Sequence, residues 1–124
     1  MKVLITGGFG FIGGRLGQYL NLLGYEVLLG SRKRQDSPSW LQQANTAIID
    51  WDNHYSLMEI CDGIDAVVHA SGMNSHDCSL NPEQAFIVNG VYTERLIKSA
   101  IQCGVKKFIY LSTAHVYAST LEGT

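Results

Sequence analysis

Glycines in one early loop are the residues whose spacing points most directly to chemistry. Four of them stand between an apolar run and a helical pattern: Gly7, Gly8, Gly10 and Gly13. A loop that holds a pyrophosphate needs glycine for a sharp turn, for close approach of backbone amides and for close packing of helix on strand; Gly10 and Gly13 suit the last two roles. The anion then rests on free amides at the helix N-terminus. The loop predicts a dinucleotide site, and the alternative is a structural tight turn.

The segments on either side of this loop have the patterns that such a site requires. Val3–Ile5 is an unbroken apolar run, typical of a central parallel strand covered on both faces. From Ile12 to Leu23 the apolar residues follow helical spacing, and Gly24 stands where a C-terminal glycine cap belongs. Because the motif is specific only between a strand and a helix, this context favours the phosphate-binding interpretation.

Strand and helix patterns alternate along the rest of the chain. A short helix is expected at Tyr55–Cys61, and a long one begins at the capping residue Asn81 and ends at Gly104. Four further strands are predicted, at Tyr25–Gly30, Thr46–Asp50, Asp65–Ala70 and Lys107–Ser112. This alternation predicts an α/β fold, a doubly wound parallel sheet of Rossmann-like type. The expected strand order is 3-2-1-4-5, with the cofactor at the carboxyl ends of the strands.

Composition limits the size, partners and compartment of the chain. Its 124 residues are 46% hydrophobic, so they form at most one domain with a real core. A net charge of -2 gives no reason to expect a nucleic acid or a membrane as partner. No signal-peptide or membrane-spanning pattern is present, so the expected location is cytoplasmic.

Cys61, Cys78 and Cys103 are expected to be free thiols. His76 and Cys78 are too few for a metal site, and none is predicted.

The residues after the second predicted strand bear on the choice of cofactor. A carboxylate there holds the ribose hydroxyls of NAD, but this chain has Ser31, followed by Arg32, Lys33 and Arg34. A carboxylate repels a 2'-phosphate, whereas a hydroxyl and a guanidinium bind one through charge-assisted hydrogen bonds. The pattern favours NADP over NAD, and the alternative is an ordinary solvated basic loop.

Five motifs in a fixed order carry a resemblance to a known family. They are TGGFGFIG from Thr6, Asp50-Trp51, HASG from His69, NGVYTERLI from Asn89 and YLSTAHVYA from Tyr110. With these motifs the chain, from Lys2 to about Ala118, resembles the N-terminal portion of an extended short-chain dehydrogenase/reductase. That family contains NAD-dependent epimerases and dehydratases that act largely on nucleotide sugars. The resemblance implies a small-molecule substrate and hydride transfer to and from a sugar or alcohol carbon.

The resemblance assigns cofactor contacts to the glycine loop. Gly7, Gly10 and Gly13 match the glycines that contact the pyrophosphate in the family. Phe11 and Ile12 match a bulky pair, which we expect to cover the loop.

Two later segments match further cofactor contacts of the family. Asp50 and Trp51 match the pair whose carboxylate and backbone meet the adenine. A helix cap at the strand end is the alternative role for Asp50. Ala70, Ser71 and Gly72 match the segment that lines the ribose and phosphates of the cofactor, where small side chains leave its channel open.

Asn89 is singled out by its place on the long predicted helix. Its carboxamide shares an apolar stripe with Ala85, Tyr92, Leu96 and Ala100, and a polar group on a buried stripe needs partners. In the resembling family the matching Asn anchors structure beside the active site. We therefore expect Asn89 to support the cofactor site, and the alternative is a partly exposed Asn at the margin of the stripe.

Thr113 is the catalytic candidate. It follows the last predicted strand and matches the Ser or Thr that hydrogen-bonds the reacting hydroxyl or carbonyl in the family. The alternative is a Thr that only satisfies backbone groups. Ala114 and His115 stand where some sugar dehydratases carry an Asp-Glu pair. This difference counts against a dehydratase and favours an epimerase or a reductase as the expected activity.

The catalytic base of the family is absent from the chain. That base is a Tyr with a Lys four residues later, and none of the six tyrosines here has such a lysine. We therefore expect residues 1–124 to be the N-terminal part of an NAD(P)-binding domain, truncated after strand five, without its substrate domain and inactive alone. The alternative is a stand-alone, non-catalytic NAD(P)-binding or interaction module. The uncovered last strand predicts self-association.

Overall fold

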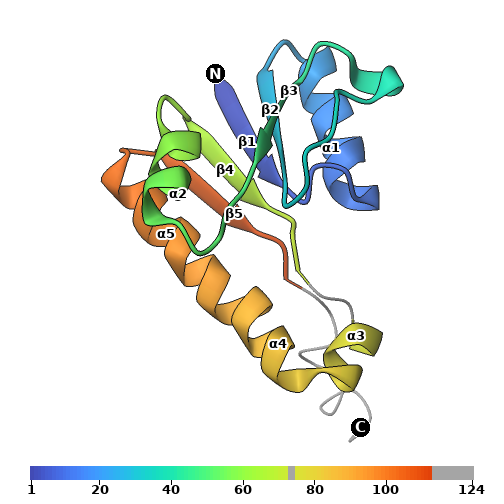
Figure 1. Ribbon diagram of the computed structural model, residues 1–124. Helices are drawn as coiled ribbons and strands as arrows, with labels where there is room; N and C mark the ends of the chain where they lie inside the picture. Colours follow the sequence, from blue (N-terminus) through green and yellow to red (C-terminus); the bar gives the residue numbers. More distant parts are fainter. Residues whose placement is uncertain (73–74, 113–124) are drawn as a thin grey trace, which may run out of the picture.

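The computed structural model describes residues 1–72 and 75–112, whose strands form one parallel sheet (Figure 1). The strands are β1 (Lys2–Thr6), β2 (Glu26–Ser31), β3 (Asn45–Ile48), β4 (Ala66–His69) and β5 (Lys107–Tyr110). Their spatial order is β3-β2-β1-β4-β5, and each neighbouring pair runs parallel. The predicted fold class and strand order are confirmed. Because the chain crosses from β3 to β4, the order reverses beside β1, which places the switch point of the sheet there.

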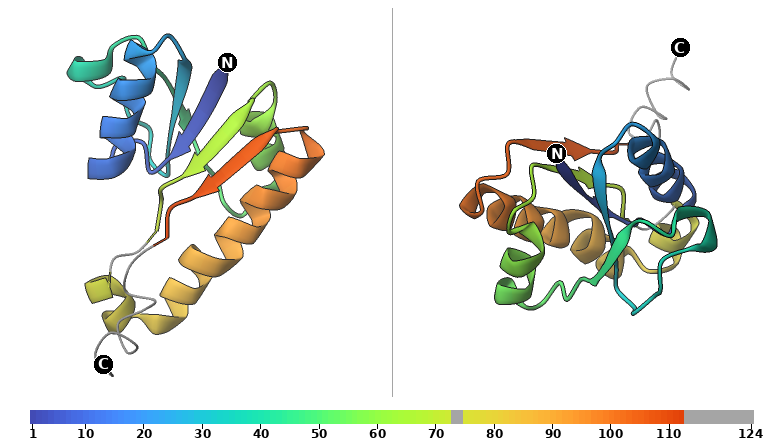
Figure 2. Two further views of the ribbon diagram at one scale, coloured as in Figure 1. Left: turned by 180° about the vertical axis from the view of Figure 1, so that it is seen from behind. Right: turned by 90° about the horizontal axis from the view of Figure 1, so that it is seen from above.

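Helices cover both faces of the sheet (Figures 1 and 2). Helix α1 (Phe11–Leu22) lies on one face, with the 3-10 turn η1 (Ser39–Leu41) packed beside it. Helices α2 (His54–Cys61) and α5 (Tyr92–Gln102) pack against each other on the opposite face. Figure 1 also shows that α3 (Ser75–Leu80) and α4 (Pro82–Phe86) lie beyond the carboxyl ends of β4 and β5.

Alternation along β1 divides the core into two apolar clusters. Val3 and Ile5 face α1 and pack with apolar side chains of β2, β4 and η1. Leu4 faces the other way and packs with Leu57 of α2 and Leu96 of α5. These side chains are at most 4% exposed, as expected for a central strand with a helix layer on each side.

The segment from Asn81 to Gly104 is helical as predicted, with one interruption that the sequence did not predict. The Asn81 side chain accepts the Gln84 N–H at 3.2 Å, and α4 (Pro82–Phe86) begins at the proline. The π-helical turn η2 (Ile87–Val91) joins α4 to α5. Gly104 ends the helix with a φ of +75°. The π turn changes the rotation per residue, so it alters which side chains face the sheet.

Several element boundaries differ from the predicted ones. Strand β3 ends at Ile48 rather than Asp50, and β5 ends at Tyr110 rather than Ser112. Helix α2 is capped by Asn53, whose side chain accepts the Ser56 N–H at 3.2 Å, so the alternative of a helix cap at Asp50 is wrong. Helix α3 (Ser75–Leu80) was not predicted, because six residues SHDCSL show no apolar periodicity.

The three cysteines form no disulfide, as predicted. Burial, with a smaller contribution from Cys103, raises the pKa of Cys61 to about 12, which keeps this thiol protonated at neutral pH.

Across residues 1–72 and 75–112 there is no helix with the length and apolar character needed to span a membrane.

Candidate functional site

A cavity of about 300 Å³ opens at the carboxyl ends of β1, β2 and β4. Ligands of open α/β sheets bind at this edge, and the volume of this cavity is at the lower end of the range for pockets that bind small molecules. The cavity is lined by the glycine loop, the end of β2, the segments after β3 and β4, and one helix face: Gly7, Phe9, Gly10, Gly30, Ser31, Arg32, Ile49, Trp51, Ala70, Ser71, Gly72, Val88 and Tyr92. Most of the predicted cofactor residues therefore share one space.

The glycine loop is too tightly folded to carry side chains at several of its positions, of which Gly7 and Gly13 are packed against backbone. Gly7 has a φ of +66°, in the left-handed region that favours glycine. A Cβ on Gly7 lies 2.9 Å from backbone atoms of Ala70 and Ser71, and a Cβ on Gly13 overlaps the carbonyl oxygen of Gly7. Gly10 donates its N–H to that same oxygen at 3.0 Å. The loop therefore turns sharply beside the backbone after β4, and α1 starts directly against it.

The N-terminus of α1 supplies backbone donors at the cavity. Gly10 is the N-cap residue, and no side chain caps the helix there, so the first amides remain available to an anion. Phe11 and Ile12 are 74% and 62% exposed and do not line the cavity. The Phe11 ring instead packs against the Arg15 guanidinium, 4.4 Å from the ring centroid. Phe9 lines the cavity, although its place between two glycines gave no sign of this.

The end of β2 brings a hydroxyl group and a positive charge to the cavity. Ser31 Oγ accepts the backbone N–H of Lys33 at 3.3 Å and the side-chain amide of Gln35 at 2.9 Å. Arg32 is exposed and is the one charged residue among the described residues that line the cavity. Because no carboxylate of the described chain lines this space, its electrostatic potential favours an anionic ligand.

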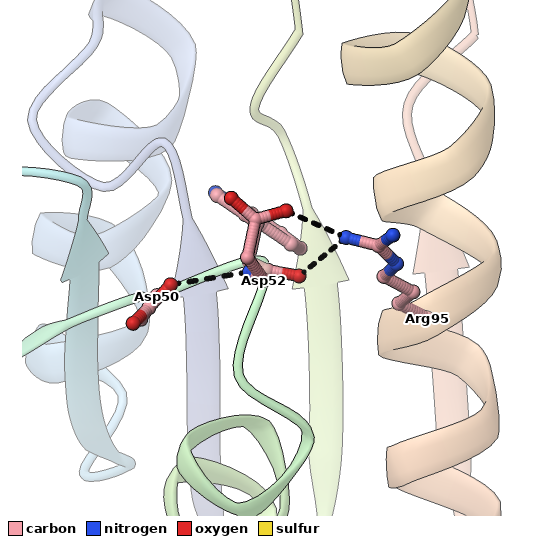
Figure 3. A network of polar contacts seen from close by, with 4 residues as sticks. Asp50, Asp52 and Arg95 are labelled. Carbon is pink, nitrogen blue, oxygen red and sulfur yellow. Dashed lines mark hydrogen bonds and ion pairs between the residues drawn. The ribbon is translucent and has the colours of Figure 1, made fainter.

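Trp51 forms a wall of the cavity, and its backbone is held from α5. The indole is 6% exposed and stacks on the Tyr92 ring, with centroids 5.2 Å apart and an interplanar angle of 3°. Arg95 donates from Nη1 to the Trp51 carbonyl and to Asp52 Oδ1, each at 2.9 Å (Figure 3). No sequence pattern indicated the stack, since its two rings are far apart along the chain.

Asp50 lies outside the cavity, in an adjoining space. Its Oδ1 accepts the Asp52 N–H at 3.1 Å, which closes a tight turn after β3 (Figure 3). The adjoining space has a volume of about 370 Å³ and shares Arg32, Trp51 and Tyr92 with the cavity. The two spaces form neighbouring parts of one surface along the carboxyl edge of the sheet.

The segment after β4 is fixed by Thr6 at the end of β1. Thr6 Oγ1 accepts the N–H groups of Ala70 at 3.1 Å and Ser71 at 3.3 Å. The same oxygen lies 2.7 Å from His69 Nδ1. His69 is 1% exposed, and burial lowers its pKa to about 4, so the imidazole is neutral at pH 7. Sequence reasoning used His69 only as part of a motif and missed these contacts.

Asn89 lies beside the segment after β4 and does not line the cavity. It lies in η2, is half-buried and donates from Nδ2 to Cys78 Sγ at 3.5 Å. A Cβ on Gly72 lies 3.0 Å from Asn89 Oδ1, so the amide packs against the segment after β4. Gly13 also lies behind the lining, against the loop backbone. Thr113, the predicted catalytic residue, is outside the described residues.

Comparison with known proteins finds curated relatives that match almost the whole chain. The chain is 35% identical to a dTDP-6-deoxy-L-talose 4-dehydrogenase (NAD(P)(+)) of Kitasatospora kifunensis, over 99% of this chain and 38% of that protein. It is 34% identical to a UDP-glucose 4-epimerase of Klebsiella pneumoniae, over 94% of this chain and 92% of that sequence.

Solved structures agree with the fold described above. A UDP-glucose 4-epimerase from Bifidobacterium longum in complex with NAD+ and UDP superposes with a TM-score of 0.85 at 25% identity, over 94% of this chain and 38% of that one. The chain thus spans well under half of that enzyme. The model of the NAD dependent epimerase/dehydratase family matches residues 3–124. This match covers almost the whole chain, which therefore belongs to the NAD-dependent epimerase/dehydratase family.

Proposed function

We propose that this chain is the dinucleotide-binding portion of an oxidoreductase that acts on a nucleotide sugar. The observation that carries the proposal is the single cavity onto which the glycine loop, the Ser31-Arg32 pair and the segment after β4 all open. The bound molecules of solved relatives support it, since one is described with NAD+ and UDP and another, from Thermotoga maritima, with UDP-glucose.

The residues present fit a dinucleotide. The glycine loop forms a cradle that a Cβ at Gly7 or Gly13 would fill, and the amides of α1 suit a pyrophosphate. The adjoining space beside Asp50 suits the adenine, whose amino group can donate to the carboxylate. The segment Ala70–Gly72 then lies along the ribose and phosphates. The side-chain oxygen of Asn89 packs against this segment at Gly72 and helps to position it.

We further propose that NADP is favoured over NAD. Ser31 and Arg32 stand where a carboxylate would hold the two ribose hydroxyls of NAD, and both line the cavity. The guanidinium can bind a 2'-phosphate bidentately, and the Ser31 hydroxyl can add a hydrogen bond. The Kitasatospora relative, described as accepting NAD(P)(+), supports this part of the proposal.

Replacing Arg32 by Ala tests both the site and its preference. We expect wild-type chain to bind NADP more tightly than NAD in calorimetric titrations. A charge-assisted hydrogen bond is worth about 1.5–3 kcal/mol, and the exposed position of Arg32 puts it at the low end, so R32A should lose about tenfold in NADP affinity. Its NAD affinity should stay unchanged. Lys33, outside the cavity lining, gives the matched control K33A. Equal loss of NADP affinity in K33A and R32A would reduce the role of Arg32 to general positive charge.

The chemistry we propose for the whole protein is hydride transfer with a sugar or alcohol carbon. A bound nicotinamide supplies the hydride acceptor, and Thr113 holds the reacting hydroxyl or carbonyl by a hydrogen bond. The Tyr and Lys that complete this machinery in the family are not among the residues of this chain. We therefore propose that residues 1–124 form the N-terminal part of the domain and are inactive alone.

A second candidate is a stand-alone, non-catalytic NAD(P)-binding or interaction module. The cavity fits this candidate as well, because the residues that line it need only bind the dinucleotide. The coding sequence distinguishes the two candidates: continuation past Thr124 into a Tyr-xxx-Lys supports the enzyme, and a stop codon supports the module.

We expect residues 1–124 on their own to self-associate. Strand β5 is one edge of the described sheet, and its residues Ile109 and Tyr110, with Leu111 just after it, are 36–51% exposed. An open apolar edge pairs with other strands. Sedimentation should show an average mass that rises with concentration, and I109K should lower it toward the monomer. L22K, on the exposed side of α1, is the control and should leave association unchanged. A wild-type monomer at millimolar concentration would refute this expectation.

A further inference from the structure

Three side chains between the sheet and α5 form a chain of hydrogen bonds with a single direction. They come from β1, β4 and α5: Thr6, His69 and Thr93. Thr6 and His69 are directly paired in the parallel register of β1 and β4, which brings the two side chains onto the same face. His69 Nδ1 lies 2.7 Å from Thr6 Oγ1, and His69 Nε2 lies 2.8 Å from Thr93 Oγ1.

The direction follows from counting protons. Thr93 Oγ1 donates its proton to the Asn89 carbonyl at 2.9 Å, so it can only accept from His69. The proton of the neutral imidazole is therefore on Nε2, and Nδ1 accepts the proton of Thr6. Thr6 Oγ1 in turn accepts the amides of Ala70 and Ser71. Ser71 Oγ also lies 3.5 Å from His69 Nδ1, at the limit of a hydrogen bond, so the lone pair of Nδ1 goes to the much shorter contact with Thr6. The Thr6 and Thr93 hydroxyls each donate once.

The two ends of this series reach two different segments of the lining of the cavity. One end holds the backbone of Ala70 and Ser71, which line it. The other end holds the Asn89 carbonyl in the π turn, between Val88 and Tyr92, which also line it. A π turn is rare inside a helix, and a Thr side chain bonded back to residue i−4 is a contact that bends a helix locally, so Thr93 fixes the geometry where η2 meets α5.

We propose that His69 is a positioning residue for the dinucleotide site: as the neutral Nε2–H tautomer it ties the loop after β4 to the π turn of the long helix. This inference rests on the proposed dinucleotide site. The imidazole is enclosed by Trp51, Phe108 and Tyr110 in addition to the two threonines, and Tyr110 is the one ionisable side chain among these contacts. We call the hydrogen-bonded series Thr6, His69 and Thr93 the relay. It fixes the distance between the two segments of the cavity lining and takes no part in the chemistry inside the cavity.

The first test uses no cofactor. Nitrogen NMR of the imidazoles in the wild-type chain should show His69 protonated at Nε2 and not at Nδ1 near pH 7. The hydrogen bonds of Thr93 go to His69 and Asn89, and the Ser71 amide donates to Thr6. T93V should nevertheless speed hydrogen exchange of the Ser71 amide by about tenfold, because His69 loses its partner at Nε2. T93S keeps the hydroxyl and should retain wild-type exchange. The strand threonine Thr46, outside the relay, gives the control T46V.

The second test asks whether the relay positions the binding site. NADP titration should show a loss of affinity of about fivefold to tenfold in T93V and wild-type affinity in T93S and T46V, the effect of one lost hydrogen bond. A Nδ1–H tautomer, unchanged Ser71 exchange in T93V, or equal NADP affinity in T93V and T93S would each overturn the inference. If the wild-type chain bound neither NADP nor NAD, the proposed function would fail, and the positioning role of His69 would fail with it. The exchange rate of the Ser71 amide would still show whether Thr93 and Ser71 are coupled through His69.

Discussion

Replacing Gly13 by Ala should weaken dinucleotide binding by about 100-fold, the cost of overpacking by about 3 kcal/mol. A Cβ at this position overlaps the carbonyl oxygen of Gly7, which is backbone and cannot rotate away. The loop or the start of α1 must therefore move, and the helix amides lose their alignment with the pyrophosphate. Calorimetric titration with NADP measures the loss directly.

The matched control for this substitution is Gly90 in the π turn. A Cβ there meets nothing within 4 Å, so G90A adds the same methyl group without a clash. We expect G90A to bind NADP as wild type does. Circular dichroism should show that G13A is folded, and the milder variant G10A, whose Cβ lies 3.2 Å from the same oxygen, serves if it is not. Unchanged affinity in both G13A and G10A would contradict the assignment of this loop to the pyrophosphate.

Acid should destabilise the chain through His69 by about 3 kcal/mol between pH 6.5 and pH 4. Burial lowers the pKa of the folded imidazole from 6.5 to about 4. Between these values the unfolded chain takes up a proton that the folded chain refuses, so stability falls as the pH falls. Above pH 6.5 neither state is protonated and the full stability is present; below pH 4 this group causes no further loss.

Urea unfolding at pH 7.5 and pH 4 measures the effect against variants that lack the imidazole. H69N keeps an acceptor near Nδ1, and H69Q keeps a donor near Nε2. Each should lose about 3 kcal/mol less than wild type over this interval, since the other titrating groups are common to all three proteins. Identical pH dependence in wild type and both variants would contradict the buried neutral histidine. Proton NMR of His69 in the wild-type chain gives the pKa even if a variant does not fold.

The sheet could be predicted from the sequence because its signals are local. Apolar runs such as Val3–Ile5, glycines at helix ends and the Asn81-Pro82 cap each act over a few residues, and their alternation allows few topologies. Cofactor residues that stand at the ends of strands could also be predicted, because the strand places them: Gly7, Ser31 and Ala70 all line the cavity. Strand ends moved by one or two residues, since polar residues there fit a strand or a loop equally well.

The contacts that depend on packing between distant segments could not be predicted. The pairing of Thr6 with His69 requires the register of β1 and β4, and the stack of Trp51 on Tyr92 requires α5 to pack beside the segment after β3. The contact of the Phe11 ring with the Arg15 guanidinium, one helical turn away, was not predicted either. The π turn at Asn89 also has no local signal; its support from Thr93 becomes visible only in three dimensions.

The most direct test of the dinucleotide site is a nitrogen–proton NMR spectrum of residues 1–124 with and without NADP. We predict that the amides of Gly7 to Gly13, Ser31, Arg32 and Ala70 to Gly72 shift in a saturable manner, since these line or support the cavity. Amides of η1 and of the start of β5, which lie away from it, should stay in place. Shifts confined to those distant segments, or none at millimolar NADP, would contradict the account.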